Sequence, residues 1–561
     1  MSDPSLRFRQ VHLDFHTSED IPGIGSAFDP DEFAETVAGA SVDSITVFAR
    51  CHHGWLYYPS KRFPERVHPQ LERKNLLGEQ IEALHLRNVR APIYVTVQWD
   101  NYASIRRPEW LALNADGDPA RYLPYEPGFY ADLCVNTPYG EFLKENVREI
   151  IEMYPTDGIF FDIVNYLDCS CRYCIEGMDR DGIDRSDPQA RIGWYKQMLD
   201  AWKRDMTEFV RSPAPEATVF YNSGHVGPHI RESAPDYSHY ELESLPSGAW
   251  GYMHFPTSVR FARNLDKPCL GMTGKFHTSW GDFHSFKNPA ALEFECFRMI
   301  AMGARCSIGD QLHPSGKICP TTYKLIGSVY SQVEQKEPWC TNARPVREVA
   351  VLTPEENLPP SRNIRPPASI NGLCRVLDEL RIQHEIVDSR SDLGGYKLLI
   401  LPDDLVVDDE QAEKINAFVA DGGKLLASHR GGLSVDGDAF AVDALGLEYV
   451  GPAPFSPDFL VPEGEIGLGL DETEHVMYMR GSEVKLSGAE QLAGVNRPYF
   501  NRTWQHFCSH RHTPSSGEQA YPGITRSDAG IYFAHPVFTQ YDANAPRWCK
   551  TLVANAIRML I

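Results

Sequence analysis

The chain has 561 residues, of which 42% are hydrophobic, and this is ample for a large core and two or three domains. Its formal net charge is −22 and no lysine- and arginine-rich run stands out, which argues against nucleic acid as a partner. Because no apolar stretch has the length of a signal peptide or a membrane span, we expect a cytoplasmic protein without membrane contact, whose thirteen cysteines are reduced.

Residues 1–340 alternate short apolar runs with segments of helical spacing. The runs that favour β-strands are 11–16, 44–50, 91–97, 158–162, 218–223, 238–243, 269–274 and 304–310. The segments that favour helices between them are 29–40, 72–87, 140–154, 190–210, 258–265 and 288–303. Eight such strands in one domain predict a (β/α)₈ TIM-like barrel rather than an open sheet.

Polar groups stand where these runs end, and the active site of such a barrel is built at the carboxyl ends of its strands. They are His16, Arg50 to His53, Trp99, Asp162, Asn222, Glu243, Lys275 and Asp310. A barrel without a function would not need most of its strands to finish on groups capable of chemistry.

Carboxylates are the first candidates. Asp162 ends the apolar run GIFFD, and Glu241 and Glu243 lie two apart on the sixth strand, so their side chains share one side of that strand. Strands four and six face each other across a barrel mouth, and two opposed carboxylates are what glycoside hydrolysis requires. The alternative is that Asp162 forms a buried ion pair with Arg50 or Lys275.

Histidines and aromatic residues gather at the same predicted rim. The segment FARCHHGWLYYPSK leaves strand two with His52 and His53 followed by Trp55, Tyr57 and Tyr58. Histidine exchanges hydrogen bonds with sugar hydroxyls, and aromatic faces pack against the apolar side of a pyranose. Together with His16, Trp99 and Trp280, these residues favour sugar binding over a set of unrelated strand-end side chains.

The cluster DCSCRYC contains Cys169, Cys171 and Cys174. It offers three thiols and no obvious second half of a Cys-x-x-Cys pair, so we expect a packed loop with free thiols, with structural zinc as the alternative.

The pattern of predicted strands and helices changes after residue 344. Runs at 347–354, 384–389, 396–404 and 422–428 read as parallel strands, with helical segments at 370–382 and 409–423. They predict a flavodoxin-like, doubly wound domain over 345–450. It lacks a Gly-x-Gly-x-x-Gly turn, so nucleotide binding is not supported. Residues 451–561 predict a β-rich region that ends in a helix.

Several motifs together resemble the α-L-fucosidase family of retaining glycoside hydrolases, and more closely its divergent relatives with a β-galactosidase-type trimerisation domain. ARCHHGWLYYPSK is similar to that family's Ala-Lys-His-His-Asp-Gly-Phe segment and its following Pro-Ser-Lys, with His52 on the second histidine. DFHTSE resembles the strand-one motif Phe-Ile-His-Trp-Gly, and MYPTDGIFFDI resembles the motif that carries the family nucleophile. The segment from Lys275 to Ile318 resembles the Ser-Trp-Gly-Tyr stretch and the last helix and strand.

The resemblance implies an exo-acting, retaining α-L-fucosidase. Asp162 would be the nucleophile and Glu243 the acid/base, with Glu241 as the second choice, and a dry aromatic mouth would raise the pKa of the acid. The sugar would be held by His16, His52, His53, Trp99, Asn222, Lys275 and Trp280. Neither a metal nor an organic cofactor is expected. The alternatives are a retaining hydrolase of a galactoside or arabinoside, and a non-catalytic carbohydrate-binding barrel.

The same resemblance makes residues 345–561 a trimerisation-type half and implies a homo-oligomer, a dimer or trimer. The segment NRTWQHFCSHRHTP at 501–514 is unusually rich in histidine, tryptophan and arginine. We expect it, and His510 in particular, to reach a barrel mouth, either its own or a neighbouring subunit's; the alternative is a structural corner.

Overall fold

The structure is a computed structural model that describes residues 6–120, 130–359 and 365–561. By its internal contacts the chain divides into two compact units. One consists of residues 1–344 and 359–365, and the other of residues 345–358 and 366–561.

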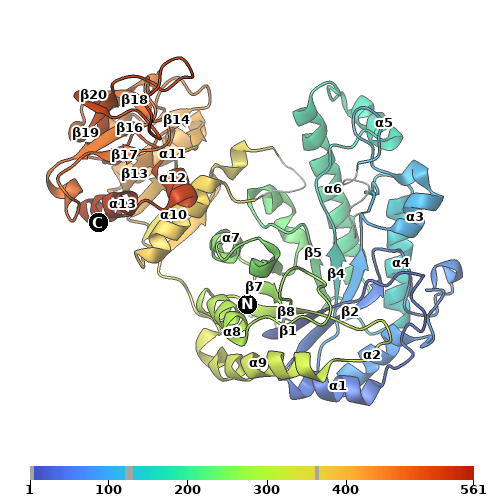
Figure 1. The fold of residues 1–561 in the computed structure, drawn as a ribbon. Coiled ribbons are helices and arrows are strands. Elements are labelled where there is room, and N and C mark those ends of the chain that lie inside the picture. The colour runs from blue at the N-terminus through green and yellow to red at the C-terminus, as the bar shows by residue number, and fades with distance from the viewer. Residues whose placement is uncertain (1–5, 121–129, 360–364) are drawn as a thin grey trace. The chain divides into compact units, whose positions relative to one another are not determined.

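The first unit is a cylinder of eight parallel strands surrounded by helices (Figure 1). The strand order is β5-β4-β3-β2-β1-β8-β7-β6, so β5 and β6 are the two edges of the sheet. These edges are joined where Ser238 N–H donates to Val219 O at 2.9 Å and Val219 N–H donates to Ser238 Oγ at 2.8 Å. The predicted TIM-like barrel is confirmed.

Each observed strand begins and ends within two residues of its predicted run. The strands are β1 (Arg9–Asp14), β2 (Ser44–Arg50), β3 (Ile93–Thr96), β4 (Gly158–Asp162), β5 (Thr218–Tyr221), β6 (Tyr240–Glu243), β7 (Cys269–Gly274) and β8 (Arg305–Gln311).

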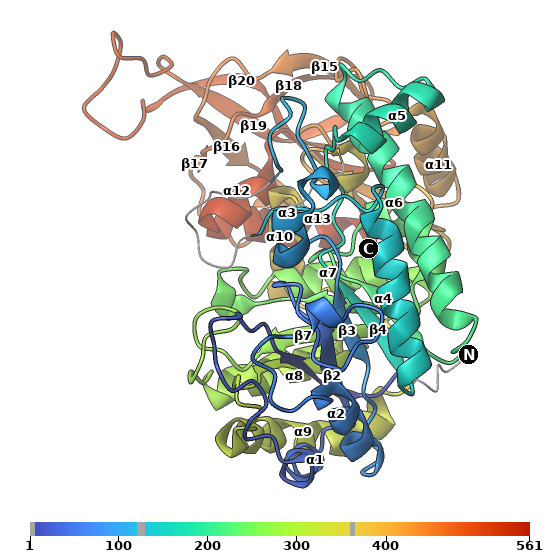
Figure 2. The same ribbon diagram turned by 90° about the vertical axis from the view of Figure 1, so that its right-hand side faces the viewer.

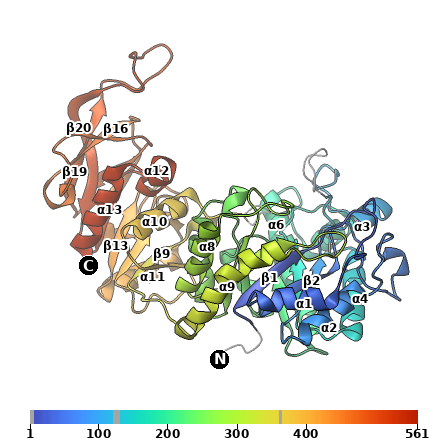
Figure 3. The same cartoon turned by 60° about the horizontal axis from the view of Figure 1, so that its bottom comes forward.

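Helices cover the outside of this cylinder. They are α1 (Pro30–Gly39), α2 (Leu76–His85), α3 (Asn101–Arg106), α4 (Tyr139–Met153), α5 (Arg172–Asp181), α6 (Pro188–Arg211), α7 (His254–Ala262), α8 (Pro289–Ala301) and α9 (Pro320–Cys340). The long helices α4 and α6 run beside each other along one side (Figure 2). On another side α9 lies between α8 and α1 (Figure 3).

Aromatic rings fill the interior of the barrel beneath its mouth. Phe48 of β2 and Tyr94 of β3 stack with their ring centres 3.8 Å apart, and Phe160 of β4 continues the stack beside Tyr94. His12 of β1 meets Phe160 edge-on at 4.8 Å. Alternate residues of a strand point inward, so these four side chains form one layer, which we call the aromatic floor.

The second unit is built on a nine-stranded sheet in the order β10-β9-β11-β13-β21-β20-β19-β16-β17. The first five of these strands are parallel and the remaining pairs are antiparallel, so the flavodoxin-like domain with a β-rich C-terminal region is confirmed. The strands are β9 (Val349–Leu352), β10 (His384–Val387), β11 (Leu398–Leu401), β13 (Lys424–Ser428), β16 (Asp458–Pro462), β17 (His475–Met477), β19 (Glu490–Pro498), β20 (Ser515–Arg526) and β21 (Gly530–Phe533). The helices are α10 (Ala368–Glu379), α11 (Asp409–Ala420), α12 (Val537–Asn544) and α13 (Arg547–Leu560).

The parallel part of this sheet takes its last strand, β21, from the chain beyond residue 450. A domain boundary at 450 therefore stays a prediction. Within the described ranges, no helix combines the length and the apolar character that crossing a bilayer would need.

Candidate active site

Three residues at the carboxyl ends of β4, β5 and β6 are joined by hydrogen bonds. Asn222 follows β5, and its Nδ2 donates to Asp162 Oδ1 at 2.9 Å and to Glu243 Oε2 at 3.0 Å. Two carboxylate oxygens on one amide nitrogen cannot be farther apart than the sum of these two distances, about 5.9 Å. The carboxylates of strands four and six thus share one site.

These residues line a cavity of about 460 Å³ at the mouth of the barrel. Its volume lies within the range of small-molecule sites and suits a sugar unit. Its walls combine charged, imidazole and aromatic side chains: His12, Asp14, His16, His52, Trp99, Tyr130, Phe160, Asp162, Ile163, Asn222, Glu243, Met272, Trp280, Gly281 and Gln311.

Glu243 has the protonation behaviour of a general acid. Burial raises the pKa of this carboxyl to about 7, the hydrogen bond from Asn222 acts against the rise, and the nearby Asp162 charge adds to it. A carboxyl with such a pKa is partly protonated at neutral pH and can give its proton to a leaving group.

Asp162 is held on two sides. Besides the bond from Asn222, its Oδ2 accepts a 2.6 Å hydrogen bond from Tyr94 Oη. Burial raises the pKa of the Tyr94 phenol and the adjacent Asp162 carboxylate raises it further, so this hydroxyl stays a donor. Ile163, the next residue, has φ = 58°, a left-handed conformation that is unusual for a β-branched side chain and typical of functional sites.

Two stacked imidazoles form the wall beside Asp162. The rings of His16 and His52 lie 3.9 Å apart, and His52 Nε2 is 3.7 Å from Asp162 Oδ2. The backbone N–H of His52 donates to His16 Nδ1, and His16 Nε2 lies 3.0 Å from Asp14 Oδ1. Burial lowers the pKa of His52 well below its usual value, so this ring is neutral and can exchange hydrogen bonds with hydroxyl groups.

Trp99 and Trp280 complete the aromatic part of the wall. The indole N–H of Trp99 donates to Asp132 Oδ1 at 2.9 Å, which fixes the plane of that ring. Trp280 meets His12 of the aromatic floor edge-on at 5.6 Å. The cavity therefore offers flat apolar faces next to polar groups, as sugar recognition requires.

The structure brings together seven of the predicted site residues around one cavity: Asp162, Glu243, His16, His52, Trp99, Asn222 and Trp280. Glu241 is elsewhere. It lies deeper in the barrel, where its carboxylate accepts from Gln10 Nε2 at 3.1 Å and contacts His239 Nε2 at 3.0 Å. Residues two apart on a strand share a direction but sit in successive layers of a barrel, so only Glu243 reaches the mouth.

Three other predicted ligands lie off the cavity. Lys275 is buried, donates to Ser285 O and lies 3.9 Å from Asp310 Oδ1. His53 does not line the cavity, and its Nε2 shares a 3.2 Å hydrogen bond with Oη of Tyr130, which does. His510 is exposed on the second unit.

The alternative interpretation of Asp162, as the partner of Arg50 or Lys275, is wrong. Arg50 is fully buried and pairs with Asp100 at 2.5 Å, and Lys275 is directed to Asp310. Asp162 receives neutral donors instead, which leaves its charge available for chemistry.

Sequence reasoning missed Asp14, His12, Tyr130 and Gln311, all of which line the cavity. The sequence did contain a pattern that could have identified Asp14 and His12. His12, Asp14 and His16 are spaced by two along and just beyond β1, so they point to the same side of the chain as it leaves the barrel. Tyr130 comes from a long connection after β3, and no periodic pattern marks such a residue.

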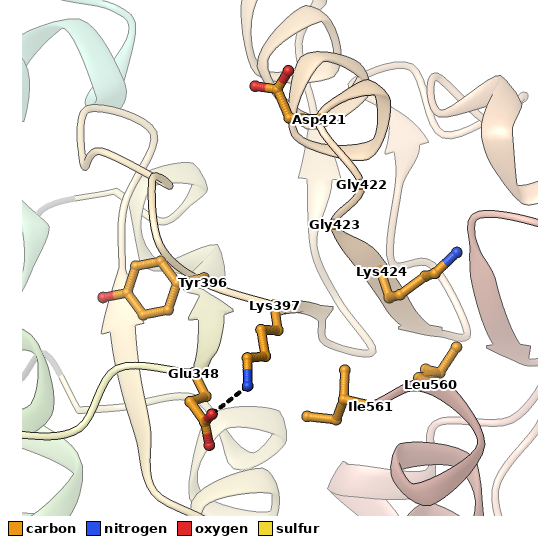
Figure 4. Close-up of a pocket in the computed structure, with 9 residues that line it drawn as sticks. All are labelled: Glu348, Tyr396, Lys397, Asp421, Gly422, Gly423, Lys424, Leu560 and Ile561. Carbon is orange, nitrogen blue, oxygen red and sulfur yellow. Dashed lines mark hydrogen bonds and ion pairs between the residues drawn. The ribbon is translucent and has the colours of Figure 1, made fainter.

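The second unit contains a larger cavity of about 640 Å³ (Figure 4). It is lined by Glu348, Tyr396, Lys397, Asp421, Gly422, Gly423, Lys424, Leu560 and Ile561. It lies at the amino ends of β9, β11 and β13, whereas doubly wound sheets bind ligands at the carboxyl ends of their strands. Its Lys397 is neutralised by Glu348 at 2.6 Å, so we place the active site in the barrel.

Comparisons with known proteins agree with this placement. Residues 29–163 match a family described as hypothetical glycosyl hydrolase 6, and residues 350–445 match the β-galactosidase trimerisation domain. A β-galactosidase from Geobacillus kaustophilus is 24% identical over 252 residues, which are 40% of this chain and 37% of that protein. The chain thus spans well under half the length of this relative.

Two solved structures are similar over nearly the whole chain. A β-galactosidase from Bacillus circulans sp. alkalophilus has a TM-score of 0.72 at 16% identity, covering 98% of this chain and 88% of the other, which shows the fold. The α-L-fucosidase isoenzyme 2 from Paenibacillus thiaminolyticus has a TM-score of 0.93 at 42% identity, covering 99% of this chain and 84% of the other. The chain is a glycoside hydrolase with a C-terminal trimerisation-type domain, and it belongs to the family of that α-L-fucosidase.

Proposed function

We propose that the protein is an exo-acting α-L-fucosidase that retains the configuration of the sugar. The mechanism rests on one observation: the Nδ2 atom of Asn222 donates to both carboxylates. The distance between the nearest oxygens of Asp162 and Glu243 is therefore at most about 5.9 Å. Retaining enzymes place their two carboxyl groups about 5–5.5 Å apart, and inverting enzymes about 6.5–9.5 Å apart. The spacing supports direct attack by Asp162 rather than attack by an intervening water.

In the first step Asp162 attacks the anomeric carbon, and the bond to the leaving oxygen breaks as Glu243 gives that oxygen its proton. In the second step Glu243 takes a proton from water, which attacks the same carbon and releases the sugar and Asp162. Asn222 and Tyr94 hold the attacking carboxylate, and the neutral His52 is placed to bind a sugar hydroxyl.

The fucoside preference is supported by the 42% identical α-L-fucosidase. A retaining hydrolase of a galactoside or arabinoside is the second candidate, because a β-galactosidase trimerisation domain and β-galactosidase structures also match. A non-catalytic binding barrel would not need two opposed carboxylates with a pKa raised on one of them. Nitrophenyl α-L-fucoside, β-D-galactoside and α-L-arabinoside distinguish these three candidates. Hydrolysis of the fucoside supports the first and hydrolysis of another glycoside the second, whereas binding without turnover supports a non-catalytic barrel.

Replacement of Asp162 by glycine tests the mechanism. We expect turnover to fall by at least about a thousandfold, because the covalent step is lost. Azide should restore part of the rate by entering the space of the missing carboxylate, and NMR should show a fucosyl azide of inverted configuration. Glu243→Gln keeps Asp162 and should therefore give no fucosyl azide of inverted configuration. If Asp162→Gly were active without azide, the assignment of Asp162 as the nucleophile would be refuted.

Two broader features are part of this proposal. None of the thirteen cysteines, all of which lie in the described ranges, forms a disulfide, which supports a reducing compartment such as the cytoplasm. The trimerisation-domain match supports a homo-oligomer, and we propose that His510 belongs to a loop that reaches a neighbouring subunit's barrel mouth.

A further inference from the structure

Four cysteine side chains meet in the interior of the barrel unit, away from the cavity. They are Cys134, Cys169, Cys171 and Cys174, all buried, and their Sγ atoms all lie within 4.8 Å of one another. Cys134 and Cys174 approach to 3.5 Å. The sequence motif alone supplied three of these thiols. The fourth, Cys134, comes from the connection that precedes α4 and joins the others only in the folded chain.

The spacing of the sulfur atoms matches a single tetrahedral ion. Zinc–thiolate bonds of about 2.3 Å in a tetrahedron put the sulfur atoms about 3.8 Å apart. Separations between 3.5 Å and 4.8 Å surround that value and leave no space between the thiols for a cluster of several metal atoms.

The surroundings also suit thiolates. Cys171 is the residue before the first turn of α5 and Cys174 lies inside that turn, so the positive end of the helix dipole faces the sulfur atoms. Asn136 Nδ2 donates to Cys174 Sγ at 3.8 Å, which is the kind of outer hydrogen bond that orients a metal ligand.

We propose that Cys134, Cys169, Cys171 and Cys174 bind one structural Zn²⁺ ion. Binding displaces the thiol protons, and four thiolates complete the coordination without an open position, so the ion does not take part in the hydrolysis. This replaces the expectation of free thiols in a packed loop, which counted only three ligands.

The ion would join the two connections that shape one side of the active site. Cys134 lies two residues beyond Asp132, which holds the Trp99 indole. The loop after β4, which begins at Ile163, carries Cys169 and Cys171, and Cys174 follows in α5. Between them, Gln98 exchanges hydrogen bonds with the backbone N–H and C=O of Asn165 at 2.8 Å each. The four cysteines therefore have a positioning role for the Trp99 wall.

Metal analysis of the full chain tests the proposal directly. Protein purified without a metal-affinity step or chelator, and dialysed against metal-free buffer, should contain about one zinc per chain. Titration with an organomercurial should release that zinc as four thiols react. Zinc below about a tenth per chain, a bound iron with visible absorption, or a disulfide within the cluster in mass spectrometry would overturn it.

Variants separate this site from the other cysteines. Cys134→Ser and Cys171→Ser should lose zinc and melt at a lower temperature, whereas Cys306→Ser, equally buried on β8, should keep it. Should the cluster variants fail to fold, the zinc content of the unmodified protein still decides. Removal of zinc from the native enzyme should raise KM more than it lowers kcat, and added zinc should reverse this; an unchanged KM would refute the positioning role.

Discussion

Asn222 donates one amide group to both carboxylates of the site, and it therefore influences the protonation of each. A hydrogen bond to the charged form of a carboxyl lowers its pKa. Asn222→Ala removes this effect, so the pKa of Glu243 should rise above about 7. As the proposed acid, Glu243 must be protonated to act, so activity should fall as pH rises through its pKa.

The high-pH limb of the kcat/KM profile should accordingly move to higher pH in Asn222→Ala, together with a lower maximal rate. Ser223→Ala, which changes the adjacent side chain, serves as the control and should leave the limb in place. A limb that moves to lower pH would contradict the assignment of Glu243 as the acid.

Glu243 also has a predictable effect on stability. Its pKa in the folded state, about 7, is above its ordinary value, because burial disfavours the charged form. At pH values below the ordinary pKa, the carboxyl is protonated in both the folded and the unfolded state and does not lower the free energy of unfolding. As the pH rises from that value to about 7, the unfolded state ionises first and the free energy of unfolding falls. Glu243→Gln should therefore melt at a higher temperature than the native protein at pH 8, with a smaller difference at pH 4.5. A lower melting temperature of the variant at pH 8 would contradict the conclusion that burial of the Glu243 carboxylate destabilises the fold.

At the scale of elements, Glu149 fastens α4 to the loop that follows β2. Its buried carboxylate accepts from Ser60 Oγ at 2.6 Å, from the backbone N–H groups of Lys61 and Arg62, and from Tyr58 Oη. Glu149→Ala should cost about 2–4 kcal/mol of unfolding free energy, because several buried donors lose their acceptor.

Denaturant unfolding measures this cost. Glu145→Ala, on the same helix with an exposed carboxylate bound to Arg62 and Arg148, should change stability by less than about 1 kcal/mol. Equal effects of the two substitutions would show that the buried network does not stabilise the loop.

Much of the barrel, and seven of the residues that line its candidate site, could be predicted from the sequence. The apolar run GIFFD predicted the fully buried strand β4. Because active sites of such barrels lie at the carboxyl ends of the strands, Asp162 at the end of this run was a candidate site residue. The depth of each side chain was harder to predict, because Glu241 and Glu243 share a strand face and differ only in their position along β6, which puts them in successive layers of the barrel. The contacts of Asn222 with both carboxylates, and of Cys134 with the other thiols, join segments that are remote in sequence. No local sequence pattern marks such contacts, so they could not be predicted.

At the scale of the whole molecule, one loop of the second unit exposes several aromatic side chains. Residues 499–514 connect β19 and β20 and extend away from the sheet (Figure 3). Its aromatic side chains are largely exposed, at 67% for Tyr499, 83% for Trp504 and 61% for Phe507. Exposed aromatic groups of this kind are typical of interfaces between subunits.

Mixed oligomers test whether this loop serves a neighbour. Asp162→Asn subunits lack the proposed nucleophile but carry His510, while His510→Ala subunits keep an intact barrel. If the loop completes a neighbouring site, each variant alone should be weak, and oligomers reassembled from both should recover activity. His506→Ala, exposed on the same loop, is the control partner. No gain on mixing, with oligomer mass verified by light scattering, would refute a shared site.

The join between β5 and β6 has a consequence for the chemistry. Three hydrogen bonds between Ser238 and Val219 close the cylinder there, and Asn222 and Glu243 lie on the two sides of the same join. Widening of the barrel at this join would increase the distance between Asp162 and Glu243, and the retaining mechanism that we propose depends on that distance. Hydrogen–deuterium exchange should be fastest among the barrel strands at Val219, and a bound sugar that bridges both sides should slow it.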